Sequence, residues 1–262
     1  MMVAPRRHGL FAACALLVLS VTACQSRPDE IEDSGTRLST AAGDILAATQ
    51  NEAASTVVSA GPTVSLGPPA APPSGQEGTD LYSLGFDLGS ADAPVRIIEF
   101  SDYGCSFCRK FHMETWPTLK IDYIDTGKLL WKTVPFVIGN WANSVEASMG
   151  AECAVEQGKA EGMTALLFER QSDWKSVSDP APPVASLAEA AGLDMTIYQT
   201  CLDESKYLWR VQAHSALARR VGVRGTPTFF VVGYGPLQGA LPLDLFKQVI
   251  DTVLVEVEAQ GR

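Results

Sequence analysis

Short apolar runs alternate with helical patterns over the second part of the chain. Residues 95–100 are apolar and β-branched, a composition that predicts a strand. A helical pattern follows over 105–125, and Pro117 within it predicts a kink. The run 128–138 predicts a second strand, parallel to the first across the helix. This region therefore predicts a β-α-β unit.

The pattern becomes helical between about residues 141 and 221. Apolar residues recur there at three- and four-residue spacing, and a proline-rich stretch at 179–183 separates the earlier helices from the later ones. Asp194 is placed to cap a short helix that carries Cys201. We expect a helical insert of about 141–221.

The sheet resumes after this insert. Residues 225–233 contain a strongly apolar run that predicts a strand. Pro227 lies at its start, a position at which proline is tolerated. A further short strand is expected around 237–241, and a closing helix begins near Pro242. The predicted fold class is α/β.

The first 23 residues have the pattern of an export signal. A basic start with Arg6 and Arg7 precedes an apolar stretch over 10–21 that is short for a membrane span. The sequence Val21-Thr22-Ala23-Cys24 resembles a bacterial lipobox, in which cleavage before Cys24 leaves that cysteine to carry lipid. The alternative is a plain signal peptide cut near Ala23, with Cys24 as a free thiol.

Residues 24–80 form a low-complexity segment that we interpret as a membrane tether. Large apolar side chains are scarce, and proline, glycine and serine crowd 61–75. The alanine-rich part over 38–58 could form a helix, but its apolar face is thin. The folded domain is therefore expected over 81–262.

The charge narrows the choice of partners. The formal net charge is −10, and loss of the two arginines of residues 1–23 leaves −12 on the remainder. This balance disfavours nucleic acid as a partner of the folded part. No cofactor is expected.

Cys105 and Cys108 stand at C-x-x-C spacing at the start of the first predicted helix. The free N–H groups and dipole of a helix N-terminus stabilise a thiolate at Cys105, whereas Cys108 is expected to be more buried. This asymmetry predicts a nucleophile and a resolving cysteine. A metal site would need further ligands, and His112 is the only nearby one, so no metal is expected.

The other cysteines sort by position. Cys14 leaves with the signal, and Cys24 takes lipid. In an exported protein the proximity of Cys105 to Cys108 leaves Cys153 to pair with Cys201. The alternative is that these last two are buried, unpaired thiols.

The order of these features resembles the DsbA-like branch of the thioredoxin superfamily. The resemblance rests on Glu99-Phe-Ser-Asp-Tyr-Gly-Cys-Ser-Phe-Cys108, on the distant Gly225-Thr-Pro-Thr228, and on the size of the insert between them. It covers about residue 81 to the C-terminus. It implies a thioredoxin fold with an inserted helical subdomain.

The resemblance also implies roles for single residues. Cys105 matches the nucleophile of the family and Cys108 its resolving cysteine. Pro227 matches a cis-proline that faces the disulfide, and Thr226 presents backbone groups to a bound substrate strand. Glu99 matches a buried acid that helps proton transfer at the resolving cysteine; the alternative is a carboxylate exposed at a strand end.

The two residues between the cysteines, Ser106 and Phe107, differ from the Pro-His of the best-known member. They border the site where substrate binds, and Phe107 supplies no cation, so strong oxidising power does not follow from the resemblance. Lys110 and His112 are interpreted as solvated surface residues.

The first functional hypothesis is an exported dithiol oxidase that acts on cysteine-containing exported proteins. Its recycling partner would be a membrane oxidase of the DsbB or vitamin K epoxide reductase type. The second is a reductase or isomerase of the same fold. The third is a redox-inactive binding module or metallochaperone that uses Cys105, Cys108 and His112.

Overall fold

The computed structural model describes residues 84–261. The expected signal peptide over 1–23, the lipidation site Cys24 and the expected tether over 24–80 all lie outside these residues. Within 84–261, no helix combines the length and the apolar character needed to cross a membrane.

A five-stranded sheet forms the centre of the described part, in the order β1-β3-β2-β4-β5. The strands are β1 (Phe86–Leu88), β2 (Val95–Ser101), β3 (Leu129–Pro135), β4 (Thr228–Val231) and β5 (Gly235–Gln238). Strands β2 and β3 run parallel, and the other neighbours are antiparallel. The predicted β-α-β unit is confirmed.

The edges of the sheet differ from the sequence prediction. Strand β1 was not predicted, because three residues carry too short a pattern; it pairs with β3. Gly85 precedes it with φ +73, and a Cβ at that position would lie 2.1 Å from the carbonyl oxygen of Thr133. Strand β5 begins two residues earlier than expected and ends at Gln238.

The helix expected over 105–125 is divided into three. Helix α2 (Ser106–Glu114) is followed by α3 (Trp116–Leu119) and by a π-helical turn, η1 (Lys120–Ile124). Pro117 lies in the first turn of α3, where its missing N–H removes no internal hydrogen bond. The predicted kink is therefore a break between two helices.

The prediction of a helical insert is confirmed. The insert consists of α4 (Ser144–Glu156), α5 (Ala160–Glu169), α6 (Gln171–Trp174), α7 (Ala181–Ala190), α8 (Met195–Asp203) and α9 (Leu208–Arg220). Asp194 caps α8, as predicted, by accepting from the backbone N–H groups of Thr196 and Ile197. Helix α7 begins inside the proline-rich stretch, since proline suits a first helical turn.

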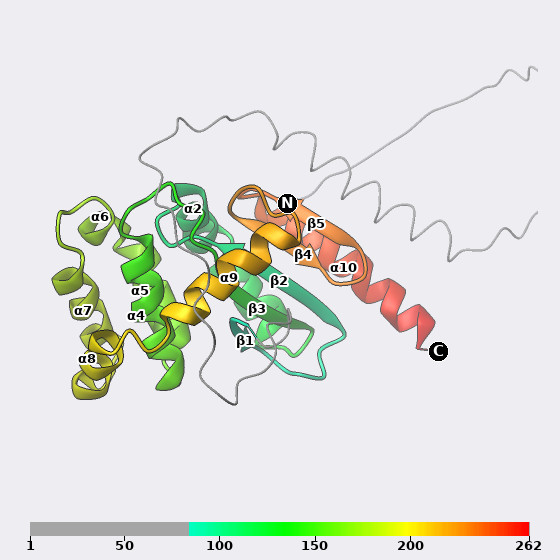
Figure 1. Ribbon diagram of the computed structural model, residues 1–262. Helices are drawn as coiled ribbons and strands as arrows, with labels where there is room; N and C mark the ends of the chain where they lie inside the picture. The colour runs from blue at the N-terminus through cyan, green and yellow to red at the C-terminus, as the bar shows by residue number, and fades with distance from the viewer. Residues whose placement is uncertain (1–83, 262) are drawn as a thin grey trace, which may run out of the picture. The chain divides into compact units, whose positions relative to one another are not determined.

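Helices cover both faces of the sheet (Figure 1). Helix α9 leads from the insert back to the sheet, and the closing helix α10 (Leu243–Gln260) lies at the far side from α4–α8. Strand β2 is buried on both faces. Val95 and Ile97 pack in the core with α2 and α10, whereas Ile98 and Phe100 pack with Ala218 of α9.

A third core lies within the insert and reaches the start of α2. Its buried members include Cys105 and Cys108 together with Phe168 and Leu187 of the insert. The two cysteines are therefore packed against the insert rather than against the sheet alone.

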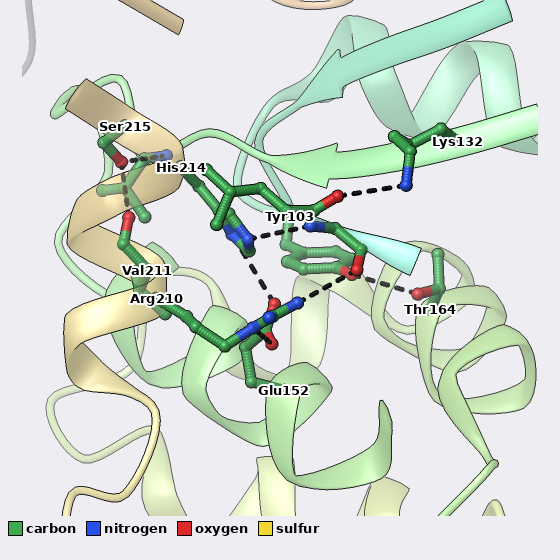
Figure 2. Close-up of polar contacts among 11 residues, drawn as sticks. Tyr103, Lys132, Glu152, Thr164, Arg210, Val211, His214 and Ser215 are labelled. Atoms are coloured by element: carbon green, nitrogen blue, oxygen red, sulfur yellow. Dashed lines mark hydrogen bonds and ion pairs between the residues drawn. The ribbon is translucent and has the colours of Figure 1, made fainter. Parts of the chain in front are cut away.

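The start of the described chain is fastened to the insert by polar contacts (Figure 2). The Gly85 N–H donates to Nε2 of His214, and Arg210 donates to the Gly85 carbonyl oxygen and to the buried carboxylate of Glu152. Lys132 donates to the carbonyl oxygen of Leu84. These bonds hold Leu84 and Gly85, the two residues directly before β1, in place.

Candidate active site

A tight turn connects β2 to α2 and places the two cysteines. Oδ1 of Asp102 accepts the Gly104 N–H at 2.8 Å and the Ser144 hydroxyl at 2.5 Å, and Oδ2 accepts the Ile138 N–H at 3.0 Å. A Cβ on Gly104 would lie 2.7 Å from Cβ of Trp141, so this position has room only for glycine. Burial raises the pKa of Asp102 to about 6, against the lowering effect of these bonds.

The sulfur of Cys105 occupies the N-cap position of α2. Sγ accepts the backbone N–H of Cys108 at 3.5 Å, a bond that a helix N-terminus offers to an anion. The pKa of Cys105 is lowered to about 7, first by a hydrogen bond from the Cys108 thiol, against burial, and then by Thr226 and backbone N–H groups. A large fraction of this thiol is therefore ionised near neutral pH.

Cys108 lies one turn further into the helix and is fully buried. Burial raises its pKa well above the usual range, and the neighbouring Cys105 raises it further. Both sulfurs are free thiols in this structure. The two thiols therefore differ in acidity in the direction expected for a nucleophile and a resolving group.

The Thr226–Pro227 segment lies beside Cys105. The peptide bond between these residues is cis. The Cys105 thiol donates to the Thr226 carbonyl oxygen at 3.3 Å, which brings together residues 121 positions apart. Strand β4 begins directly after this segment, at Thr228.

Glu99 is buried, so the alternative of an exposed carboxylate is wrong. Strand alternation turns it toward α2, where Oε1 contacts Nε2 of His112 at 2.9 Å. Oε2 accepts the Nε1–H of Trp131 at 3.0 Å. Neither oxygen contacts a cysteine directly.

The surface interpretation of His112 is wrong as well. His112 is buried, and its ring stacks on Phe168 of the insert with the centroids 4.1 Å apart. The helical periodicity of the sequence could not reveal this burial, because the residue that covers His112 comes from another helix, α5. Lys110 is exposed and lies 4.0 Å from Glu114, as a surface residue would.

The residues between the cysteines face outward. Ser106 is exposed, and Phe107 is 42% exposed. Together with Thr226 they lie next to Cys105, which is itself only 2% exposed.

Cys153 of α4 and Cys201 of α8 form a disulfide, with their Cα atoms 6.0 Å apart. Over residues 84–261, no three side chains of the histidine, cysteine and carboxylate types gather in a way that could hold a metal ion.

Comparison with known proteins decides the family. The family model described as Thioredoxin matches residues 85–252, which is well over half of the chain. The chain belongs to this thioredoxin family. The structure of α-DsbA1 from Wolbachia pipientis matches with a TM-score of 0.61 and 23% identity, over 67% of this chain and 94% of that one. The fold of this thioredoxin-family protein is thus DsbA-like.

Two further matches come from Bacillus subtilis. The oxidised structure of BdbD matches with a TM-score of 0.59 and 24% identity, over 64% of this chain and 92% of that chain. Disulfide bond formation protein D is 26% identical over 55% of this chain and 66% of its own length. The thioredoxin-family chain spans 56 to 66% of the length of three curated relatives, from Rickettsia bellii, Rickettsia conorii and Bacillus subtilis.

Sequence reasoning missed several polar residues at this thioredoxin-family site. In the sequence analysis, Asp102 occurs only within the stretch from Glu99 to Cys108 and is assigned no role. Gln171 and Lys175 of the insert are not named there. Gln171 donates to the carbonyl oxygens of Tyr103 and Cys105. An aspartate two residues before the glycine of Asp102-Tyr103-Gly104-Cys105 is a signal that could have been found, because an aspartate side chain commonly accepts the backbone N–H two residues on in such turns.

Proposed function

We propose that this protein is an exported thiol–disulfide oxidoreductase. It exchanges a Cys105–Cys108 disulfide with cysteines of exported proteins and acts as a dithiol oxidase. The observation that carries the proposal is the different placement of the two thiols: Sγ of Cys105 caps α2 beside Thr226, whereas Cys108 is fully buried one turn further on. In agreement with this placement, the pKa of Cys105 is lowered to about 7 and that of Cys108 is raised. Relatives named for disulfide-bond formation support it.

The reaction consists of two thiol–disulfide exchanges. A substrate thiolate attacks Sγ of Cys105 in the oxidised protein, a mixed disulfide forms, and Cys108 leaves and takes up a proton. A second substrate thiolate then attacks the substrate sulfur of the mixed disulfide and releases Cys105 as a thiolate. The substrate loses two electrons, and the cysteine pair gains them.

The lowered pKa of Cys105 supports thiol–disulfide exchange at this sulfur. A stabilised thiolate is a good leaving group in the second exchange, and it stabilises the reduced protein relative to the disulfide. Relative to a pair with an ordinary thiol, both effects ease donation of the disulfide, but a pKa of about 7 is also that of the reductant thioredoxin. A reductase or isomerase is therefore the alternative, and a measurement of the reduction potential separates the two.

Glu99 is assigned to proton transfer at Cys108. Its carboxylate is held by His112, which stands four residues after Cys108 and so on the same face of α2. We assign His112 as the link between this carboxylate and the buried thiol. A proton is needed there because Cys108 leaves with a raised pKa.

Substrate binding is assigned to the surface around Cys105. Thr226 and Pro227 would present backbone to an extended substrate segment, as an open strand edge does. Ser106 and the exposed ring of Phe107 would border the same segment. The recycling partner is proposed to be a membrane oxidase of the DsbB or vitamin K epoxide reductase type.

Attachment to the cell envelope is proposed through lipid on Cys24. Several acyl chains would hold the protein stably on a membrane surface. Labelled fatty acid should enter the wild-type protein and not Cys24→Ala. Labelling that survives this substitution would remove the anchor from the proposal.

The test of the activity uses refolding of a reduced substrate with two cysteines. Cys105→Ser should abolish oxidation, and Cys108→Ser should accumulate mixed disulfides at Cys105. Full activity of Cys105→Ser would exclude the proposed reaction. The equilibrium with glutathione gives the direction: a potential well above thioredoxin's value of about −270 mV supports the oxidase, and a value near it supports a reductant.

A further inference from the structure

A lysine of the helical insert lies against the first turn of α2. Nζ of Lys175 donates to the Ser106 hydroxyl at 3.1 Å, one residue after Cys105. The same ammonium group lies 5.2 Å from the centre of the Trp141 ring, a distance at which a cation is attracted to an aromatic face. A positive charge from the insert therefore lies at the start of the C-x-x-C helix.

The backbone around Lys175 is held in place on both sides. Asn143 donates its amide to the carbonyl oxygens of Trp174 and Val177, at 2.7 and 2.9 Å. Trp174 itself is buried and donates from Nε1 to the Leu167 carbonyl oxygen. The lysine is thus carried by a fixed segment and not by a free surface loop.

The same segment is fastened to the cysteine turn. Gln171 is buried and donates from Nε2 to the carbonyl oxygen of Tyr103 at 2.7 Å and to that of Cys105 at 3.0 Å. Helix α6, which Gln171 begins, ends directly before Lys175. The segment that carries the lysine is therefore fastened to the backbone of the nucleophile, Cys105.

The charges around Lys175 are those of the redox site. Burial lowers the pKa of Lys175, while the charges of Cys105, Asp102 and Cys108 act in the opposite direction. Asp102 carries a charge in both redox states, but the Cys105 thiolate exists only when the pair is reduced. The attraction between Lys175 and Cys105 therefore favours the reduced protein.

Arg109 and Lys110, which belong to α2 itself, contact groups other than the dipeptide Ser106-Phe107. Arg109 donates to the carbonyl oxygen of Glu169, and Lys110 lies near the carboxylate of Glu114. The dipeptide Ser106-Phe107 contributes no charge. Within residues 84–261, the cation that hydrogen-bonds to this dipeptide is Lys175.

We propose that Lys175 is an electrostatic positioning residue that stabilises the Cys105 thiolate and makes the Cys105–Cys108 disulfide more oxidising. The insert would thus supply the cation that the dipeptide lacks. This inference rests on the proposed disulfide exchange and deepens it.

The test compares the glutathione equilibrium and the Cys105 pKa in the wild-type protein and four variants. Lys175→Met should raise the Cys105 pKa and shift the equilibrium toward the disulfide by roughly fivefold, the effect of one nearby charge at a partly exposed site. Lys175→Arg keeps the charge and should stay within about twofold of wild type. Lys110→Met removes an exposed charge from the same region and should leave both quantities unchanged.

Lys175→Gln provides a second variant that removes the charge but can still donate to Ser106, and it should behave like Lys175→Met. Near-ultraviolet circular dichroism checks that each variant is folded. Wild-type values in both charge-removing variants, or an equal shift in Lys110→Met, would overturn the inference while leaving the activity intact. Absence of any reversible Cys105–Cys108 disulfide in the wild type would instead refute the proposed function, and this inference with it.

Discussion

The two thiols at this site lie one helical turn apart, and their pKa values are shifted in opposite directions. Sγ of Cys105 caps α2 and accepts hydrogen bonds, while the sulfur of Cys108 lies inside the core with little to stabilise a charge. The Cys108 thiol also donates to Cys105, so each cysteine contributes to the environment of the other. The immediate surroundings of the two sulfurs therefore determine which one reacts first.

The mutual hydrogen bond gives the first prediction. Cys108→Ala should raise the pKa of Cys105 above its wild-type value of about 7, because the Cys108 thiol is the largest cause of the lowering. Ultraviolet absorbance of the thiolate as a function of pH measures this shift. Met113→Ala, at an exposed position of the same helix, should not change it. An unchanged Cys105 pKa in Cys108→Ala would show that the helix terminus alone accounts for the effect.

The buried carboxylate gives the second prediction. Glu99→Gln should slow the exchange step that releases Cys108 by roughly tenfold or more, because a group positioned for proton transfer is lost. The pH profile of the rate should also change, whereas the Cys105 pKa should not. Trp131→Phe removes one hydrogen bond to Glu99 but keeps the carboxylate, and it serves as the control. Equal rates for Glu99→Gln and wild type would leave Glu99 with a structural role only.

At the scale of elements, the helical insert has a hydrophobic core of its own, and this core also covers the two cysteines. Its helices bury Cys105 and Cys108, and its α6 segment donates hydrogen bonds to the turn before them. A disulfide joins α4 to α8 across a sequence separation of 48 residues. The stability of the insert should therefore affect how firmly the two cysteines are held in position.

The disulfide gives the third prediction. The double substitution of Cys153 and Cys201 to alanine should lower the free energy of unfolding by about 4 kcal/mol, the loop-entropy value for this separation. Urea unfolding followed by far-ultraviolet circular dichroism measures the loss. The wild-type protein with this disulfide reduced should show a similar loss. Equal stability with and without the bond would mean that the helices hold the insert unaided.

At the scale of the whole molecule, polar contacts join the insert to the start of the sheet. His214 is buried, and its Nε2 accepts the Gly85 N–H, so the ring must stay neutral to keep this bond. Burial, together with the charges of Arg210 and Lys132, lowers the pKa of His214 to about 3. Protonation of this ring is therefore opposed by the folded state.

This arrangement gives the fourth prediction, for acid stability. An unfolded histidine takes up a proton below a pH of about 6.5, while His214 in the folded protein does not until about 3. Its contribution to stability should therefore fall by roughly 1.4 kcal/mol per pH unit below 6.5. Unfolding of wild type and His214→Gln between neutral and acid pH measures the difference in slope.

A matched comparison isolates this effect. The raised pKa of Asp102 acts in the opposite sense, since its contribution is present below about 3.8 and lost as pH rises through about 6. Asp102 is present in both proteins, so its effect cancels in the difference. Parallel curves for the two proteins would show that His214 is not the group responsible.

The sequence by itself determined the features that depend on neighbouring residues. The alternation of Val95 to Phe100, the C-x-x-C turn, and the cap at Asp194 each involve residues within a few positions, and local geometry makes such patterns readable. The α/β order and the site of the nucleophile followed from them. A three-residue strand such as β1 carries no comparable pattern.

Only the tertiary structure decided which distant side chains meet. His112 is buried because Phe168 covers it, and Lys175 reaches Ser106 because Gln171 and Asn143 fix its segment. The residues that contact each other in these examples are more than 30 positions apart in the sequence. Their contacts depend on how the insert packs against α2, and that packing is a property of the folded chain as a whole.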